Sequence, residues 1–142
     1  MDAEVDVIAD LGRLDRTSLV MPLAEHSTHL LTVAAAALES VMHLREDVQD
    51  LMGALAQAGA IPVFPVLVGP DARAGRDRAD LDGMLDEAGI AVRPTLSLPI
   101  DPKALARLEQ GESPSGRLGR TLLMRGAKNL AASLGMTEVI SA

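Results

Sequence analysis

Short apolar runs alternate with longer helical patterns along the whole chain, and this alternation restricts the folds open to it. Apolar runs typical of buried strands occupy residues 5–9, 30–33, 63–68 and 90–98. Patterns typical of helices occupy residues 19–26, 38–57, 77–88, 102–110 and 117–134. Alternation of this kind, with long crossovers, favours parallel strands. We therefore predict one α/β domain over residues 1–142, with a parallel β-sheet of about four strands flanked by helices.

Several residues mark the ends of these elements. Ser18 is a candidate N-cap for the first helix, and Gly59 follows the longest helical pattern as a stop signal. Pro102 suits the first position of a helix. Pro65 cannot donate a hydrogen bond within a sheet, so we expect the third strand to lie at an edge or to carry a bulge. Residues 71–76 are predicted to form a polar loop.

Composition and charge exclude several classes of function. The chain has no Cys and one aromatic residue, Phe64, so thiol catalysis, Cys-ligated zinc and aromatic stacking on nucleic acid are not expected. The net charge is −7, with 7 basic and 17 acidic side chains in residues 1–102 and 6 basic and 3 acidic in residues 103–142. Such an acidic body repels nucleic acid. Without Cys, a signal-peptide pattern or an apolar run of about 18 residues, the sequence favours a cytoplasmic protein.

The acidic turn after the first apolar run is the motif that points most directly to chemistry. Residues 5–9 lead straight into Asp10, and Gly12 follows two residues later. Many P-loop ATPases present their second nucleotide motif as an Asp at a strand end followed by such a Gly. The phosphate-cradling run G-x-x-x-x-G-K-[ST] is absent from the sequence. Without that loop, we favour a structural strand-end turn for Asp10 and Gly12.

Four segments in order resemble the C-terminal half of MinD/ParA-type ATPases, the deviant-Walker P-loop proteins of chromosome partitioning and of cell-division or flagellar positioning. Residues 5–12 resemble the family's apolar strand with its D-x-G turn, and residues 29–46 resemble its L-L-V … L-E-S-V-x-x-L-R-E stretch. Residues 98–102 resemble its I-P-x-D turn, and residues 116–134 resemble its closing helix. The resemblance implies a truncated P-loop NTPase-like fold.

The resemblance also implies which residues would lie near a nucleotide. By this likeness Asp10, Gly12, Pro99 and Asp101 are nucleotide- or Mg²⁺-proximal, and ATP and Mg²⁺ are cofactors of the family only. The family's phosphate loop, with its lysines, has no counterpart in the sequence, and residues 68–70 replace the Asn that commonly reads adenine. We therefore expect no catalytic residue, no cofactor for the isolated chain and no ATP hydrolysis.

A role and two kinds of partner follow from the same resemblance. It implies a partitioning or positioning protein, for a chromosome, a plasmid, a division site or a secretion apparatus. The chain would act as a non-hydrolytic binding or scaffold domain, or as part of a split ATPase. In the family the phosphate-loop strand lies between the strands that resemble residues 5–9 and 29–33. Without it these edges either pair directly or stay open, so we expect a homo-oligomer or a partner chain that bears the phosphate loop.

Two alternatives remain open. One is a receiver-like or flavodoxin-like signalling module, because residues 6–13 also resemble the phospho-acceptor strand of receivers. Asp10 would then be the acceptor and Thr32 the switch hydroxyl, although the acidic pair for Mg²⁺ and the expected Lys near Gly69 are missing. The other is a pseudo-enzyme whose only function is oligomerisation.

Metal and membrane sites are not predicted. His26 and His29 straddle a helix-to-strand junction without a third ligand. The acidic residues between 77 and 87 lack the spacing of an EF-hand and indicate a solvated helix face. Residues 117–134 form a basic amphipathic pattern, and we favour docking of its leucines on the sheet over contact with anionic lipid. Gly126 weakens this segment as a free-standing helix.

Overall fold

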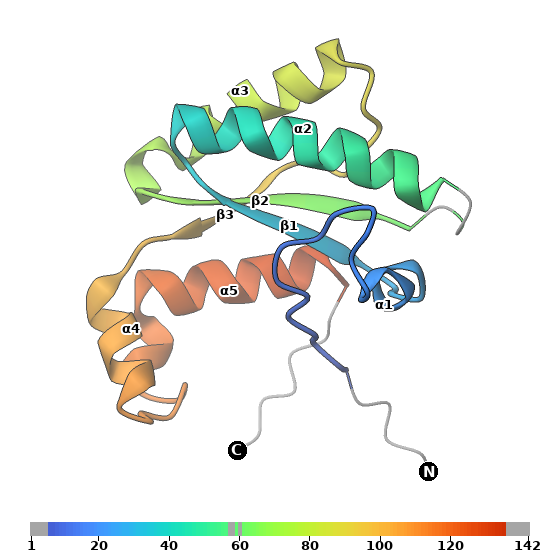
Figure 1. Cartoon of the computed structure of the whole chain (residues 1–142). Coiled ribbons are helices and arrows are strands. Elements are labelled where there is room, and N and C mark those ends of the chain that lie inside the picture. The colour runs from blue at the N-terminus through green and yellow to red at the C-terminus, as the bar shows by residue number, and fades with distance from the viewer. Residues whose placement is uncertain (1–5, 57–58, 60, 136–142) are drawn as a thin grey trace.

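Three parallel strands form the sheet of this protein, in the order β1-β2-β3. The computed structural model describes residues 6–56, 59 and 61–135. The strands are β1 (Leu30–Ala35), β2 (Val63–Gly69) and β3 (Leu96–Pro99). Helices α2 and α3 cover one face of the sheet, and α5 lies against the other (Figure 1). The α/β class with a parallel sheet is thus confirmed, although the described residues form three strands and not four.

The helices follow the predicted order. They are α1 (Met21–Glu25), α2 (Leu38–Leu55), α3 (Ala74–Glu87), α4 (Pro102–Glu109) and α5 (Leu122–Ser133), with short 3₁₀ turns η1 (Asp71–Arg73) and η2 (Leu118–Arg120). Pro102 is at the first helical position of α4 as predicted. Gly59 has a φ of 105°, which suits a chain reversal after α2. Residue 57, the predicted end of that helix, lies outside the described residues.

The predicted strand at residues 5–9 is wrong for its described part. Residues 6–10 have no regular secondary structure, and Val7 and Ile8 are each 87% exposed. A strand needs a neighbour that satisfies its backbone groups. No described strand pairs with residues 6–9, so the apolar pattern alone does not produce a strand. Val5 lies outside the described residues.

Pro65 lies in the central strand, so its predicted edge position is wrong. Alternate residues of β2, among them Pro65 and Gly69, direct their backbone groups toward β3, as the hydrogen bond from Ile100 N to Gly69 O (3.0 Å) indicates. The ladder with β3 begins only at Val66, which lies opposite Leu96. The missing N–H of Pro65 therefore costs no hydrogen bond, because β3 does not pair with β2 before Val66.

Three further boundaries differ from the sequence predictions. Residues 71–76, predicted as a loop, form η1 and the start of α3. The predicted strand at 90–98 is shortened to β3, because Pro94 has no N–H to offer a ladder. Ser18 does not cap α1; its Oγ accepts a hydrogen bond from Asp15 N at 2.9 Å. Local side-chain bonding thus replaces capping there.

The last helix begins later than predicted. Residue 117 was the expected start, but α5 begins at Leu122 after the turn η2. Thr121 is the N-cap, and its Oγ1 accepts a hydrogen bond from Met124 N at 3.4 Å. A side-chain cap of this type satisfies one of the first free N–H groups of the helix.

The core lies mainly between α2, α3 and the sheet. One cluster gathers at the amino end of the strands, around Leu30, Val63 and Leu55, and it includes Met21 and Ala24 of α1. A second cluster joins α2 and α3 to β2. A third and smaller cluster, made of Ala104, Leu118 and Leu123, lies on the α5 side next to Leu98. The two faces of the sheet are therefore unequally covered.

Candidate functional site

Asp10 and Gly12 form a local turn in an exposed segment. The Asp10 Oδ1 atom accepts a hydrogen bond from Gly12 N at 2.9 Å, and Gly12 has a φ of 63°. A short Asp side chain that bonds the backbone two residues on defines an Asx turn. Here this turn follows no strand, so Asp10 does not stand at the tip of a sheet as the sequence suggested.

Pro99 and Asp101 occupy the carboxyl end of β3. Pro99 is buried against α5, where a Cβ at Gly126 would collide with its ring. Asp101 is the N-cap of α4, and its Oδ1 accepts a hydrogen bond from Ala104 N at 3.1 Å. Both residues thus have structural roles, since Asp is among the preferred N-cap residues.

The structure does not join these two pairs through a shared contact. The described hydrogen bonds of Asp10 and Asp101 are both local, within two or three residues. Thr32, the second residue of the receiver alternative, has a buried Oγ1 with no hydrogen-bond partner among the described residues. No described hydrogen bond links Asp10 to Asp101 or to Thr32.

The outer edge of β1 has no strand partner among the described residues. Leu30 N donates to Pro62 O at 3.0 Å and Ala36 N donates to Val68 O at 2.8 Å, so the even-numbered residues of β1 face β2. Because the direction alternates along a strand, the backbone groups of Leu31 and Val33 point away from the sheet. No described residue pairs with them, and the Val33 side chain is 61% exposed. An unpaired apolar edge of this kind can accept another strand.

The segment before α1 is held against α2 and the amino end of the sheet, and none of its described hydrogen bonds goes to β1. Leu11 and Leu14 pack against the cluster at the amino end of the strands. Arg16 pairs with Asp50 of α2 at 3.3 Å, and both side chains are largely exposed. The hydroxyl and backbone N–H of Thr17 donate to Asp15 and lower the pKa of that carboxyl. Residues 11–17 are thereby anchored, whereas residues 6–9 are not.

A groove runs along β3, at the edge of the sheet opposite to β1. It has a volume of about 470 Å³ and lies between α3 and α5. Arg78 of α3 and Arg125 of α5 line it, together with Ser97 on the strand. The Arg78 Nε donates to Ala74 O at 3.3 Å, within its own helix. Asp71 also lines the groove, and none of the described hydrogen bonds joins its carboxylate to Ser97.

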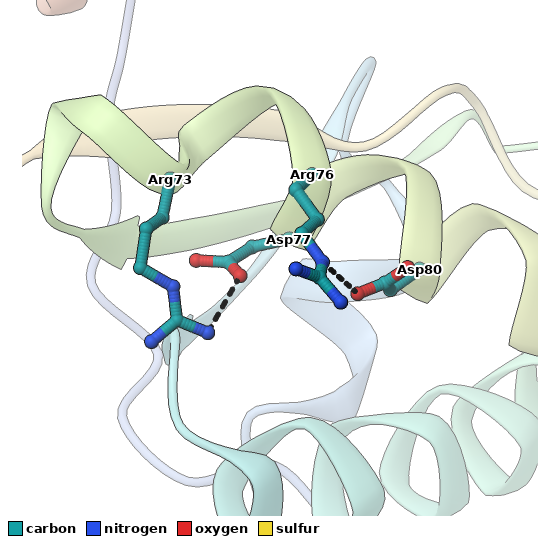
Figure 2. A network of polar contacts seen from close by, with 4 residues as sticks. All are labelled: Arg73, Arg76, Asp77 and Asp80. Carbon is teal, nitrogen blue, oxygen red and sulfur yellow. Dashed lines mark hydrogen bonds and ion pairs between the residues drawn. The ribbon is translucent and has the colours of Figure 1, made fainter.

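The acidic residues of α3 are held in contacts of their own. Figure 2 shows Asp77 facing Arg73 and Asp80 facing Arg76, at 3.4 and 3.8 Å. Asp82 Oδ1 accepts a hydrogen bond from Thr95 N at 2.9 Å and so ties α3 to the segment before β3. Both side chains of the Arg76–Asp80 pair are largely exposed, and such a surface pair contributes little to stability. The prediction of a solvated acidic face therefore holds for Asp80, Asp86 and Glu87, which are exposed, but not for Asp77, whose side chain is 12% exposed, or for the half-buried Asp82.

The histidines are likewise engaged locally. His26 Nδ1 lies 2.7 Å from Pro22 O, and His29 Nδ1 lies 3.2 Å from Thr28 Oγ1. The His29 ring also tilts against Phe64, with centroids 5.7 Å apart. Within residues 6–56, 59 and 61–135, no three His, Asp or Glu side chains are grouped so that they could hold a metal ion.

Comparisons with known proteins gave no match to this chain, whether against protein-family models, curated proteins or solved structures. Among the described helices, none is both long and apolar enough to cross a membrane.

Proposed function

We propose that this chain is a MinD/ParA-like partitioning or positioning protein that acts in the cytoplasm as a non-hydrolytic binding or scaffold domain. A partner chain that bears a phosphate loop would complete its sheet at the outer edge of β1. The observation that carries this proposal is the open edge at Leu31 and Val33, next to a segment 6–9 that has strand character but no strand partner. The resemblance implies that the phosphate-loop strand belongs between these two segments.

The parallel sheet and its short turns support this proposal. The carboxyl ends of the three parallel strands meet at one edge, where nucleotide sites of α/β proteins commonly lie. Asp101 follows β3 at that edge. Asp10 would join it only if residues 6–9 became a strand parallel to β1, and this rearrangement requires Leu11 to leave the cluster at the amino end of the strands. Nucleotide proximity of Asp10 and Gly12 is therefore a property of the completed sheet, not of the isolated chain.

A calorimetric titration with Mg-ATP tests the non-hydrolytic part of the proposal. We expect no binding to the isolated chain, because the backbone N–H groups and lysine of a phosphate loop supply most of the anchoring of a nucleotide. A dissociation constant below about 100 μM, equivalent to about −5.5 kcal/mol, would contradict this expectation. The receiver alternative is tested in parallel with a phosphoryl donor such as acetyl phosphate and the Asp10→Asn variant as control.

Cross-linking in the cells that produce the protein tests the partner. We expect a chain with a phosphate loop to cross-link to the wild-type protein and to be lost from Val33→Lys. The matched control is Leu38→Lys, since Leu38 is 79% exposed but lies at the start of α2 and not on the β1 edge. A cross-linked partner that lacks a phosphate loop, or one that Val33→Lys retains, would contradict the proposal.

A further inference from the structure

We propose that, in the absence of another chain, residues 6–9 of a second copy add as a strand to the outer edge of β1. This inference rests on the proposed function only in that it uses the same edge. It names a different occupant, the chain itself, and so predicts a reciprocal dimer in which each copy gives one segment and receives another. Exchange of identical elements between protomers is a recognised route to dimers.

The acceptor is the row of outward backbone groups on β1. Leu31 and Val33 each present an N–H and a C=O away from β2, without a described partner. The backbone groups of Ala35 also point away from β2, but its carbonyl already accepts a hydrogen bond from Ala37 N at 2.8 Å. The side chains here are apolar, and no Lys or Pro protects this edge in the way that natural edge strands are usually protected.

The donor is the segment just before the Asx turn. Val7 and Ile8 are adjacent β-branched residues, each 87% exposed, and such residues favour strands. Added to β1, one of them would cover the face that α5 leaves open and the other would lie on the α2 side, because side chains alternate along a strand. The turn at Asp10 and Gly12 ends the segment and directs the chain back to its own body.

The anchoring of Leu11 argues for a second copy and against parallel pairing within one chain. Leu11 packs at the amino end of the strands, against a cluster that includes Leu30 and Val63. In a strand parallel to β1 and bonded to Leu31 and Val33, Ala9 would lie beside residue 33 or 34, at least about 10 Å from Leu30 at about 3.3 Å per residue. Two residues span at most about 7 Å. Parallel pairing within the chain would therefore pull Leu11 out of the core, whereas a second copy is free of that restraint.

The experiment measures self-association of the full chain by sedimentation over a wide range of protein concentration. We expect a dimer for the wild type, and at least about tenfold weaker association, about 1.4 kcal/mol, for two variants. Val33→Lys blocks the acceptor, and the double variant Val7→Asp/Ile8→Asp blocks the donor. The donor variant changes only exposed residues outside the sheet, so it tests association without threatening the fold. Leu38→Lys is the control that should dimerise like the wild type.

A mixture of the two blocked variants gives the sharpest outcome. Each alone lacks both reciprocal contacts, but together they restore one, from the intact segment of Val33→Lys to the intact edge of Val7→Asp/Ile8→Asp. We expect the mixture to associate more tightly than either variant alone. The proposal is overturned by a wild-type monomer, by a dimer that neither variant weakens, or by a mixture that remains monomeric.

Hydrogen exchange separates self-association from the alternatives. Protection of the Leu31 and Val33 amides in a monomer would show that the chain covers its own edge and would overturn the second copy as occupant. A homodimer that fails to form, together with a phosphate-loop chain captured at the same edge, would remove this inference and leave the proposed function intact. A homodimer without any such partner would do the reverse.

Discussion

β1 and β2 are neighbouring parallel strands, paired over six positions, yet they differ sharply in burial. In β2 every residue except Val68 is buried, whereas in β1 only Leu30 is. The opposed pair Val33 and Val66 shows the contrast most directly, because Val66 is 1% exposed and Val33 is 61% exposed. Both strands are apolar in sequence. Position in the sheet, not composition, decides which of them is core.

The uneven cover of the α5 face explains this difference. Gly126 lets α5 approach β3 closely, since a Cβ there would collide with the ring of Pro99. The cluster of Ala104, Leu118 and Leu123 then fills the space beneath β3. Helix α5 packs mainly on β3, so Val33 on β1 stays in contact with solvent. The α5 face of the sheet is therefore covered at β3 and exposed at β1.

The largest expected effect tests the buried strand. Leu67 of β2 is 2% exposed and packs in the cluster shared with α2 and α3. Leu67→Ala should lower the free energy of unfolding by about 4 kcal/mol, within the range for buried Leu truncation. Leu38→Ala, at a residue that is 79% exposed, is the control and should change it by less than about 0.5 kcal/mol. Chemical denaturation measures both, and similar losses would contradict the assignment of β2 to the core.

The next effect tests whether α5 docks on the sheet. Leu123 is 9% exposed and its neighbour Leu122 is 40% exposed. Leu123→Ala should cost about 3 kcal/mol, and Leu122→Ala should cost clearly less. Replacing Arg120 and Arg125 with Gln should change stability by well under about 1 kcal/mol.

A membrane-binding helix would reverse this pattern. The leucine substitutions would then leave the denaturation curve unchanged, and the arginine substitutions would weaken binding to anionic vesicles. Each lost charge near the surface is worth about 1 kcal/mol in that case. Vesicle sedimentation with both sets of variants distinguishes the two roles of α5.

The sequence predicted most of the fold where local signals agree with burial. The spacing of Val48, Leu51 and Leu55 predicts α2, and these three side chains are buried. Leu38 and Met42 belong to the same spacing, but they are 79% and 39% exposed. Pro102 marks the start of α4 for a local reason, its fixed φ and missing N–H. Such features depend on few residues close in sequence, so the chain itself contains the information.

The failures concern pairing between distant segments. Residues 6–9 have the composition of a buried strand, but whether they form one depends on a neighbour elsewhere. Pro65 led to the prediction of an edge strand. The sequence around it does not reveal that β3 pairs with β2 only from Val66 onward. The site residues depend on the same kind of long-range information: Asp10 and Asp101 each make a local hydrogen bond, and no local pattern could show whether they meet.

The smallest expected difference compares the opposed residues Val33 and Val66. Val66→Ala removes two buried methyl groups and should cost about 2 kcal/mol, combining about 0.8 kcal/mol per group with a cavity term. Val33→Ala should cost less than about 0.5 kcal/mol in dilute protein, since the side chain is 61% exposed. The same two substitutions measured at high concentration sharpen the comparison. If a second copy covers the β1 edge, the dimer stabilises the folded state by mass action. The loss from Val33→Ala should then grow with protein concentration, while that from Val66→Ala should stay constant. A Val33→Ala loss that equals the Val66→Ala loss even in dilute protein would show that this edge is already covered within one chain.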